Sequence, residues 1–129
     1  MNSRIKGNIG IGQSIAYFTS LGYSVSIPLT DTQPYDLIVD DGKFLFRVQV
    51  KYVESSYVGL RTIRCNTKET KVSLFDRKKI DILIVVRKDD GIYLIPTDEL
   101  KVKTGLKIGK KYQKWKVSHL GVGHRLESG

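Results

Sequence analysis

The sequence predicts an α/β protein whose mixed central sheet is flanked by helices. Two observations support this class: residues 8–21 have the period of an amphipathic helix, whereas several short apolar segments further along have the character of strands. Asp-Gly turns separate two pairs of these strands, as in hairpins. The 129 residues suffice for one domain, and 40% hydrophobic with 27% charged residues is typical of globular proteins. We expect the order α-β-β-β-β-(α)-β-β.

The first helix is expected at residues 8–21, because three large apolar side chains recur on one of its faces: Ile11, Ile15 and Phe18. Asn8 is placed to cap the start of this helix, and Gly22 is placed to end it. The glycines near its start do not have the spacing of a phosphate-binding loop, and no strand precedes them.

The first three strands are expected at residues 23–27, 37–39 and 44–52. A hairpin turn at Asp-Asp-Gly, residues 40–42, joins the second of them to the third. In the third strand, aromatic and valine side chains alternate with a second face made of Leu45, Arg47, Gln49 and Lys51. With the turn at residues 40–43, paired residue numbers sum to about 83, which puts residue 36 opposite about residue 47.

Three further strands are expected, at residues 57–64, 82–86 and 92–95. The second of these is continuous and mostly β-branched, which predicts a central strand covered on both faces. A hairpin turn at residues 88–91 precedes the last strand, which stops at Pro96. Short helices are expected within residues 72–77 and 98–103.

Three polar residues are predicted to meet at one end of the hairpin. Asp36 opens one strand, and Gln49 and Lys51 project from one face of its partner strand. Asp36, the Gln49 amide oxygen and the Val50 carbonyl are hard oxygen ligands suited to Mg²⁺, whose bound water can attack a phosphodiester. Lys51 can orient that water and offset charge in the transition state. The alternative is an ordinary ion pair between Asp36 and Lys51, with Gln49 a surface residue.

The charge of the chain points to an anionic partner. The net charge is +9 and the pI about 9.7, which favours DNA, RNA or a membrane surface. No acidic residue lies between Leu100 and Leu126, where lysines are interleaved with Tyr112 and Trp115. This C-terminal segment is expected either to contact phosphates or to be a solvated lysine-rich tail.

Several classes of protein are excluded by the sequence. The longest apolar segment, residues 82–86, is far shorter than a membrane span, and the N-terminus has no secretion signal. Cys65 is the sole cysteine, which fits a reducing compartment, so we expect a cytoplasmic protein. His119 and His124 cannot form a zinc site with one thiol. Glu54 is interpreted as a surface charge rather than a metal ligand.

The motifs resemble those of a known family. Pro-Tyr-Asp at residues 34–36, followed by Val-Gln-Val-Lys at residues 48–51, resembles the PD-(D/E)XK nuclease signature in its Gln-containing variant. The segments at residues 6–10 and 92–96 are also similar to members with a Gln-Val-Lys motif, above all cyanobacterial homing endonucleases encoded in group I introns. The resemblance covers roughly residues 6–100. It implies a restriction-endonuclease-like αβββαβ core with a mixed central sheet, and double-strand cleavage that leaves 5′-phosphates.

The resemblance further implies Mg²⁺ as cofactor, with Mn²⁺ as a substitute, and assembly as a homodimer or homotetramer. One position departs from the pattern. Relatives often carry a metal-binding Glu on the first helix where this chain has Ile11. Gln13 lies on another side of the helix, whereas Asn8 and Ser14 are nearer to that face but bring no charge. Asp36 is then the one expected anionic ligand, and metal affinity is weakened or catalysis impaired.

We therefore expect residues 1–100 to form the nuclease core, and residues 101–129 to form a basic extension that contacts DNA or a partner subunit. The leading hypothesis is a Mg²⁺-dependent, site-specific endonuclease for double-stranded DNA that acts in intron homing. The alternatives are a restriction-type or Holliday-junction-cleaving nuclease, a catalytically impaired DNA-binding module, and a basic RNA- or ribosome-associated protein. The expected DNA contacts are Arg61, Arg64, Lys110, Lys111, Lys114 and Trp115.

Overall fold

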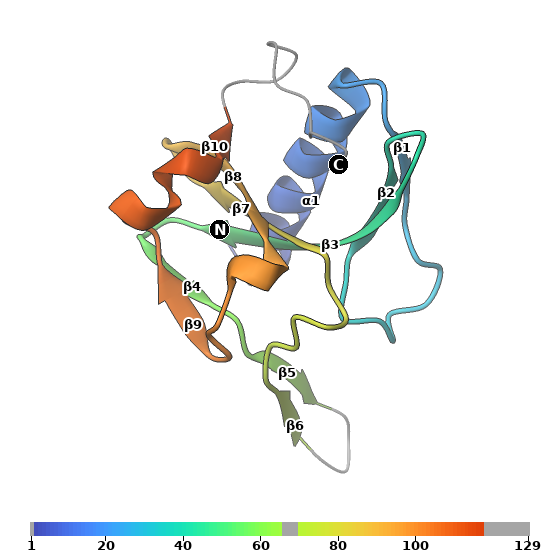
Figure 1. Ribbon diagram of the computed structural model, residues 1–129. Helices are drawn as coiled ribbons and strands as arrows, with labels where there is room; N and C mark the ends of the chain where they lie inside the picture. The colour runs from blue at the N-terminus through green and yellow to red at the C-terminus, as the bar shows by residue number, and fades with distance from the viewer. Residues whose placement is uncertain (1, 66–69, 118–129) are drawn as a thin grey trace.

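The protein is built on a six-stranded mixed sheet, seen in a computed structural model that describes residues 2–65 and 70–117 (Figure 1). The strand order is β1-β2-β3-β7-β8-β10, and only the β3–β7 pair is parallel. This confirms the predicted α/β class with a mixed central sheet. The strands of the sheet are β1 (Ser24–Ser26), β2 (Leu37–Asp40), β3 (Leu45–Val53), β7 (Ile82–Arg87), β8 (Gly91–Pro96) and β10 (Lys116–Val117).

Two small strand pairs and two 3₁₀ helices complete the fold. β4 (Tyr57–Gly59) pairs with β9 (Gly105–Lys107), and β5 (Thr62–Cys65) pairs with β6 (Thr70–Ser73). The 3₁₀ helices are η1 (Thr97–Glu99) and η2 (Lys110–Trp115). In Figure 1 the β5–β6 hairpin extends away from the central sheet.

The one α-helix among the described residues, α1 (Ser3–Ser20), begins earlier than predicted. Asn2, not Asn8, caps it, because the Asn2 side chain accepts a hydrogen bond from the Ile5 N–H at 2.9 Å. The predicted end is confirmed, since Gly22 follows the helix with a φ of +82°, which favours glycine. The helix packs closely on β3 at Gly10, where a Cβ would lie 3.2 Å from side-chain atoms of Val50 and Tyr52.

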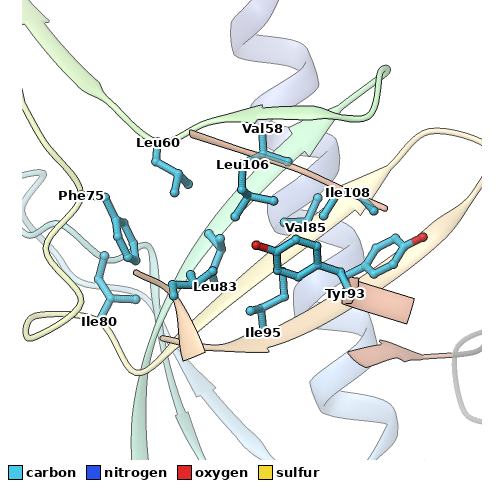
Figure 2. Packing of buried hydrophobic residues seen from close by; sticks show 12 residues of the cluster. Val58, Leu60, Phe75, Ile80, Leu83, Val85, Tyr93, Ile95, Leu106 and Ile108 are labelled. Carbon is cyan, nitrogen blue, oxygen red and sulfur yellow. The ribbon is translucent and has the colours of Figure 1, made fainter. Parts of the chain in front are cut away.

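The two faces of the sheet carry separate hydrophobic clusters. Alternate residues of β3, β7 and β8 face α1, and their cluster comprises Tyr17, Phe18, Leu37, Val39, Val48, Ile82, Ile84, Val86, Ile92 and Leu94. The opposite face packs under β4, β9 and η2 (Figure 2). This second cluster, here the β4–β9 cluster, comprises Val58, Leu60, Phe75, Ile80, Leu83, Val85, Tyr93, Ile95, Leu100, Leu106, Ile108 and Tyr112. Because β7 is buried on both faces, its prediction as a central strand is confirmed.

The β2–β3 hairpin forms as predicted, but its register differs by two residues. Asp40 pairs with Leu45 and Leu37 with Val48, so paired numbers sum to 85 rather than about 83. The Asp41 carboxylate causes the difference, because its Oδ1 accepts the N–H groups of Lys43 and Phe44, each at 2.8 Å. The loop is thereby closed one residue later than predicted. Continuing this register by one residue puts Asp36 opposite Gln49.

The crossover from β3 to β7 differs from the prediction. Residues 57–64 were expected as one strand but form β4 and β5, because the chain changes partner: the Leu60 N–H donates to the Thr104 carbonyl, and β5 pairs with β6 instead. The short helix expected within residues 72–77 does not form. Its first residues belong to β6, and the Phe75 N–H donates to the distant Lys103 carbonyl at 3.0 Å.

The described part of the C-terminal segment, up to residue 117, packs on the central sheet. The helix expected within residues 98–103 is reduced to η1 at its start, and β10 extends the central sheet beside β8. Asp90 ties this segment down by accepting hydrogen bonds from Tyr93 at 2.5 Å and Lys116 at 2.8 Å. Among the described residues, no helix is long and apolar enough to cross a bilayer.

Candidate active site

Asp36 lies against the strand segment that carries Gln49 and Lys51. Its backbone N–H donates to the Val48 carbonyl at 2.8 Å, and its carboxylate Oδ2 accepts the Val50 N–H at 2.8 Å. These two contacts hold the carboxylate at the start of β2, in the centre of the Gln49–Lys51 segment. The structure therefore brings together the residues that the sequence predicted to meet, and it brings them closer than the predicted register would.

The neighbouring strand fixes the face on which Gln49 and Lys51 lie. In the parallel β3–β7 pair, Gln49 is opposite Leu83 and Lys51 is opposite Val85. Leu83 and Val85 belong to the β4–β9 cluster, so Gln49 and Lys51 are on the face of the sheet away from α1. Figure 2 shows Leu83 and Val85 on this face. The polar site thus borders a packed hydrophobic core.

The Gln49 side chain is buried, and its oxygen has no hydrogen-bond partner in the described part of the chain. Only 7% of the residue is exposed, and its Oε1 has no hydrogen-bond partner among residues 2–65 and 70–117. An unsatisfied buried oxygen costs about 1–3 kcal/mol, so such an atom is a sign of a missing ligand or a function. The predicted alternative of a surface glutamine is wrong.

Burial shifts the titration of both charged residues of the site. Burial raises the pKa of Asp36, and the Val50 N–H and the charge of Lys51 offset part of the increase. Burial lowers the pKa of Lys51, and the charge of Asp36 offsets part of the decrease. Burial removes water from each charged group, and the opposite charge of the other group only partly compensates for this loss. Such shifted pKa values are common in catalytic sites.

We expect the metal-free protein to show this imbalance in the pH dependence of its stability. Because the pKa of Asp36 is raised on folding, its contribution to stability is present below its ordinary pKa of 3.8 and is lost as the pH rises through the folded value. Asp36→Asn removes this titration, while the amide oxygen can still accept the Val50 N–H. In chelator, the variant should therefore gain stability over the wild type as the pH rises from below 3.8 towards neutrality. Urea unfolding at several pH values measures the difference, and a difference independent of pH would contradict the raised pKa.

The donor set fits a hard divalent cation. Asp36 falls opposite Gln49 when the register is continued by one residue, and a carboxylate and an amide oxygen are both ligand types that Mg²⁺ accepts. The Val50 carbonyl remains a predicted ligand; its N–H is the group that positions Asp36. Within the described ranges no group of three or more His, Cys, Asp or Glu side chains comes together. Asp36 is the carboxylate that contacts the Gln49–Lys51 segment, and the charge of Asp31 adds to the increase in its pKa.

The first helix adds no charge to this site. Ile11 packs against the cluster on the α1 side of the sheet, and the buried Ser14 hydroxyl donates to the Gly10 carbonyl at 2.7 Å. Asn8 and Gln13 are exposed. The Ser14 hydroxyl is thus used within the helix, and the absence of a carboxylate at residue 11 is not compensated from α1.

Two further acidic residues near these strands are engaged elsewhere. Glu54 forms ion pairs with Lys6 and Lys88, which agrees with its interpretation as a surface charge. Asp81 accepts the Arg47 N–H at 2.7 Å and the Arg47 Nε at 3.0 Å, and these bonds lower the pKa of Asp81. The Arg47–Asp81 pair was not predicted. A signal existed, because Asp81 immediately precedes a buried strand, as Asp36 does.

In the sequence, the predicted DNA-contacting residues lie apart from Asp36, Gln49 and Lys51. Lys110, Lys111 and Lys114 are exposed on η2, and Lys114 Nζ lies 4.4 Å from the centre of the Trp115 ring. Tyr112 is buried in the β4–β9 cluster and is not available for stacking on a base. Arg61 is exposed between β4 and β5, and Arg64 lies in β5, where only its backbone is described.

Sequence comparison identifies the family. A profile of the PD-(D/E)XK endonuclease family matches residues 1–120. The chain belongs to this family. A relative is protein 5.3 of Escherichia phage T7, which is 33% identical over 121 residues, covering 86% of this chain and 95% of the relative. Membership implies a nuclease, and PD-(D/E)XK nucleases generally use divalent metals.

Two solved structures share the fold of this PD-(D/E)XK chain. A bacterial homing endonuclease superposes with a TM-score of 0.64 and 24% identity, over 88% of this chain and 84% of that one. A Holliday junction resolvase from Archaeoglobus fulgidus superposes with a TM-score of 0.61 and 8% identity, over 87% of this chain and 90% of that one. The restriction-endonuclease-like core that the motifs implied is thereby confirmed.

Proposed function

We propose that the chain is a Mg²⁺-dependent endonuclease that hydrolyses phosphodiester bonds in double-stranded DNA. One observation carries the proposal: the Asp36 carboxylate accepts the N–H of Val50, the residue after Gln49, whose buried side-chain oxygen has no partner in the described part of the chain. A purely structural role leaves that oxygen unexplained, whereas a cation between the two side chains would satisfy it. The solved structures of similar fold, a homing endonuclease and a junction resolvase, support DNA as the substrate.

Each residue of the site would have a distinct role. Asp36, Gln49 and the Val50 carbonyl would hold the cation, which would supply Lewis acidity and a more acidic bound water. Lys51 places an ammonium group beside the scissile phosphate and stabilises the charge that develops there. Because Lys51 is partly desolvated, its charge is less screened than that of a surface lysine. Mn²⁺, which accepts the same oxygen ligands, is expected to replace Mg²⁺.

The finer role we propose is site-specific cleavage in intron homing, on the strength of the Gln-Val-Lys motif and the similarity to a homing endonuclease. A chain with one such site cuts one strand, so cleavage of both strands calls for a homodimer or homotetramer with two-fold symmetry. Residues 101–129 would add the basic extension, with Lys110, Lys111, Lys114 and Trp115 on DNA together with Arg61 and Arg64. The lone Cys65 favours work in the reducing cytoplasm.

Incubation of the purified chain with supercoiled plasmid tests the proposal. We expect nicked and linear products with Mg²⁺ or Mn²⁺ and none with chelator, and the new ends should carry 5′-phosphates. Cleavage of a four-way junction in preference to linear duplex would favour the resolvase alternative. Tight DNA binding without cleavage under any divalent ion would instead identify an impaired DNA-binding module, which the uncharged Ile11 position would explain.

A further inference from the structure

We propose that a groove between residues 74–78 and 100–103 binds the phosphate backbone of the DNA several nucleotides from the scissile bond. This proposal rests on the proposed function and extends it: Lys101 and Lys103 lie in the basic extension already expected to contact DNA, whereas Arg77 and Lys78 are not among the predicted DNA contacts. The groove has a volume of about 620 Å³. It lies between the chain that leaves β6 and the chain that leads into β9 (Figure 1).

Both walls of the groove are fixed to each other and to the core. The Phe75 N–H donates to the Lys103 carbonyl at 3.0 Å, and the Arg77 guanidinium donates to the Leu100 carbonyl at 3.4 Å. Phe75 and Leu100 are buried in the β4–β9 cluster, where Phe75 lies beside Ile80 (Figure 2). The groove is therefore a rigid feature of the surface and not a gap between loose loops.

The groove is strongly cationic. Four of its lining side chains are basic, namely Arg77, Lys78, Lys101 and Lys103, and one is acidic. The acidic residue, Asp76, faces its own turn, where its Oδ1 accepts the Lys78 N–H at 3.0 Å. The three lysines are exposed and so can follow successive phosphates, as side chains that position a duplex without reading its bases do.

Hydrogen bonds link the groove to β3, the strand that carries Gln49 and Lys51. Lys78 lines the groove, and its carbonyl accepts the Arg47 guanidinium at 3.1 Å. Arg47 lies on the same face of β3 as Gln49 and two residues before it, which is about 7 Å along a strand. Asp81 holds Arg47 in this position through three hydrogen bonds. Lys51 is four residues from Arg47, about 14 Å along the strand, so a DNA strand whose phosphate sits at Lys51 would need to continue over several nucleotides to enter the groove.

The charge and shape of the groove favour a nucleic acid backbone over a small anion. Single anions are held by converging donors, whereas these cations line two separate walls. Leu74 and Val102 add apolar surface between the charges, which suits the sugars of a backbone. Leu74 itself is 54% exposed. An acidic protein segment is the competing occupant, and the experiment below separates the two.

The test measures binding of the full chain to a short mixed-sequence DNA duplex in chelator, where no cleavage occurs. We expect Lys101→Ser/Lys103→Ser to weaken binding by about 10-fold or more near 0.1 M salt, and to reduce the slope of log K against log salt by about 2. Lys43→Ser/Lys88→Ser removes the same charge at two turns outside the groove and should leave the slope nearly unchanged. Lys101→Arg/Lys103→Arg should retain wild-type affinity.

Three results would overturn the proposal. The first is an equal loss of DNA affinity in both serine double variants, and the second is unchanged DNA affinity in the groove variant. The third comes from a parallel measurement with a polyglutamate peptide: a groove variant that loses affinity for this peptide but not for DNA. Thermal unfolding checks that each variant is folded. Cleavage of plasmid by the wild type is scored separately, so a wild type that binds through the groove but never cuts refutes the nuclease and leaves the groove intact. A wild type that cuts, with a groove variant that binds normally, refutes the groove alone.

Discussion

Asp36→Asn and Lys51→Ala should each reduce plasmid cleavage by about a thousandfold while DNA binding persists. Asp36→Asn removes the carboxylate that contacts the Gln49–Lys51 segment, and with it the negative charge proposed to hold a divalent cation. Lys51→Ala removes the positive charge opposite the developing negative charge of the transition state. Neither side chain is part of a hydrophobic cluster, so the fold is expected to survive both changes.

Matched controls make this result specific. Asp89→Asn changes an exposed turn aspartate with a φ of 60°, a conformation that asparagine tolerates well. Lys43→Ala changes an exposed lysine in the β2–β3 turn. Both controls should cleave like the wild type. If Asp36→Asn and Lys51→Ala also cleave like the wild type, the activity comes from a contaminant and the assignment of the site is wrong.

Gln49→Leu should abolish cleavage and at the same time stabilise the protein. Leucine has a similar volume and removes the buried oxygen that has no partner in the described part of the chain. Removal of an unsatisfied buried polar atom is worth about 1–3 kcal/mol in the free energy of unfolding. The same change deletes a proposed ligand of the cation. Urea unfolding in chelator and plasmid cleavage in Mg²⁺ measure the two effects.

A second glutamine provides the comparison for this variant. The Gln113 side chain donates to the Tyr93 hydroxyl at 3.2 Å, so Gln113→Leu loses a hydrogen bond and should not stabilise the protein. A Gln49→Leu variant that is both less stable and inactive would indicate that Gln49 has a structural partner. A Gln49→Leu variant that still cleaves DNA would remove Gln49 from the site altogether.

The elements that local sequence determines were predicted well. The continuous apolar segment of β7 correctly gave its burial, and the alternation in β3 gave its two faces but not the burial of Gln49 on the polar face. The hairpin register was wrong by two residues, because it depends on hydrogen bonds from a single turn carboxylate, that of Asp41. The crossover was predicted poorly, because pairing with the distant Thr104 and Lys103 decides its backbone.

The same contrast between local and distant contacts holds for the candidate site. Asp36, Gln49 and Lys51 could be placed together from sequence, because a hairpin joins their strands and the separation along the chain is short. The burial of the Gln49 oxygen could not be predicted, since it depends on packing against β7 and the β4–β9 cluster. The groove could not be predicted either, because its two walls lie more than twenty residues apart in the chain.

A crystal structure grown with Mn²⁺, whose anomalous scattering locates the ion without ambiguity, tests the central claim most directly. We predict one peak in contact with an Asp36 carboxylate oxygen and Gln49 Oε1, with the Val50 carbonyl completing the protein ligands and water filling the remaining positions. An ion bound elsewhere on the chain, or a Gln49 oxygen turned towards a protein donor with no ion beside Asp36, would contradict the account.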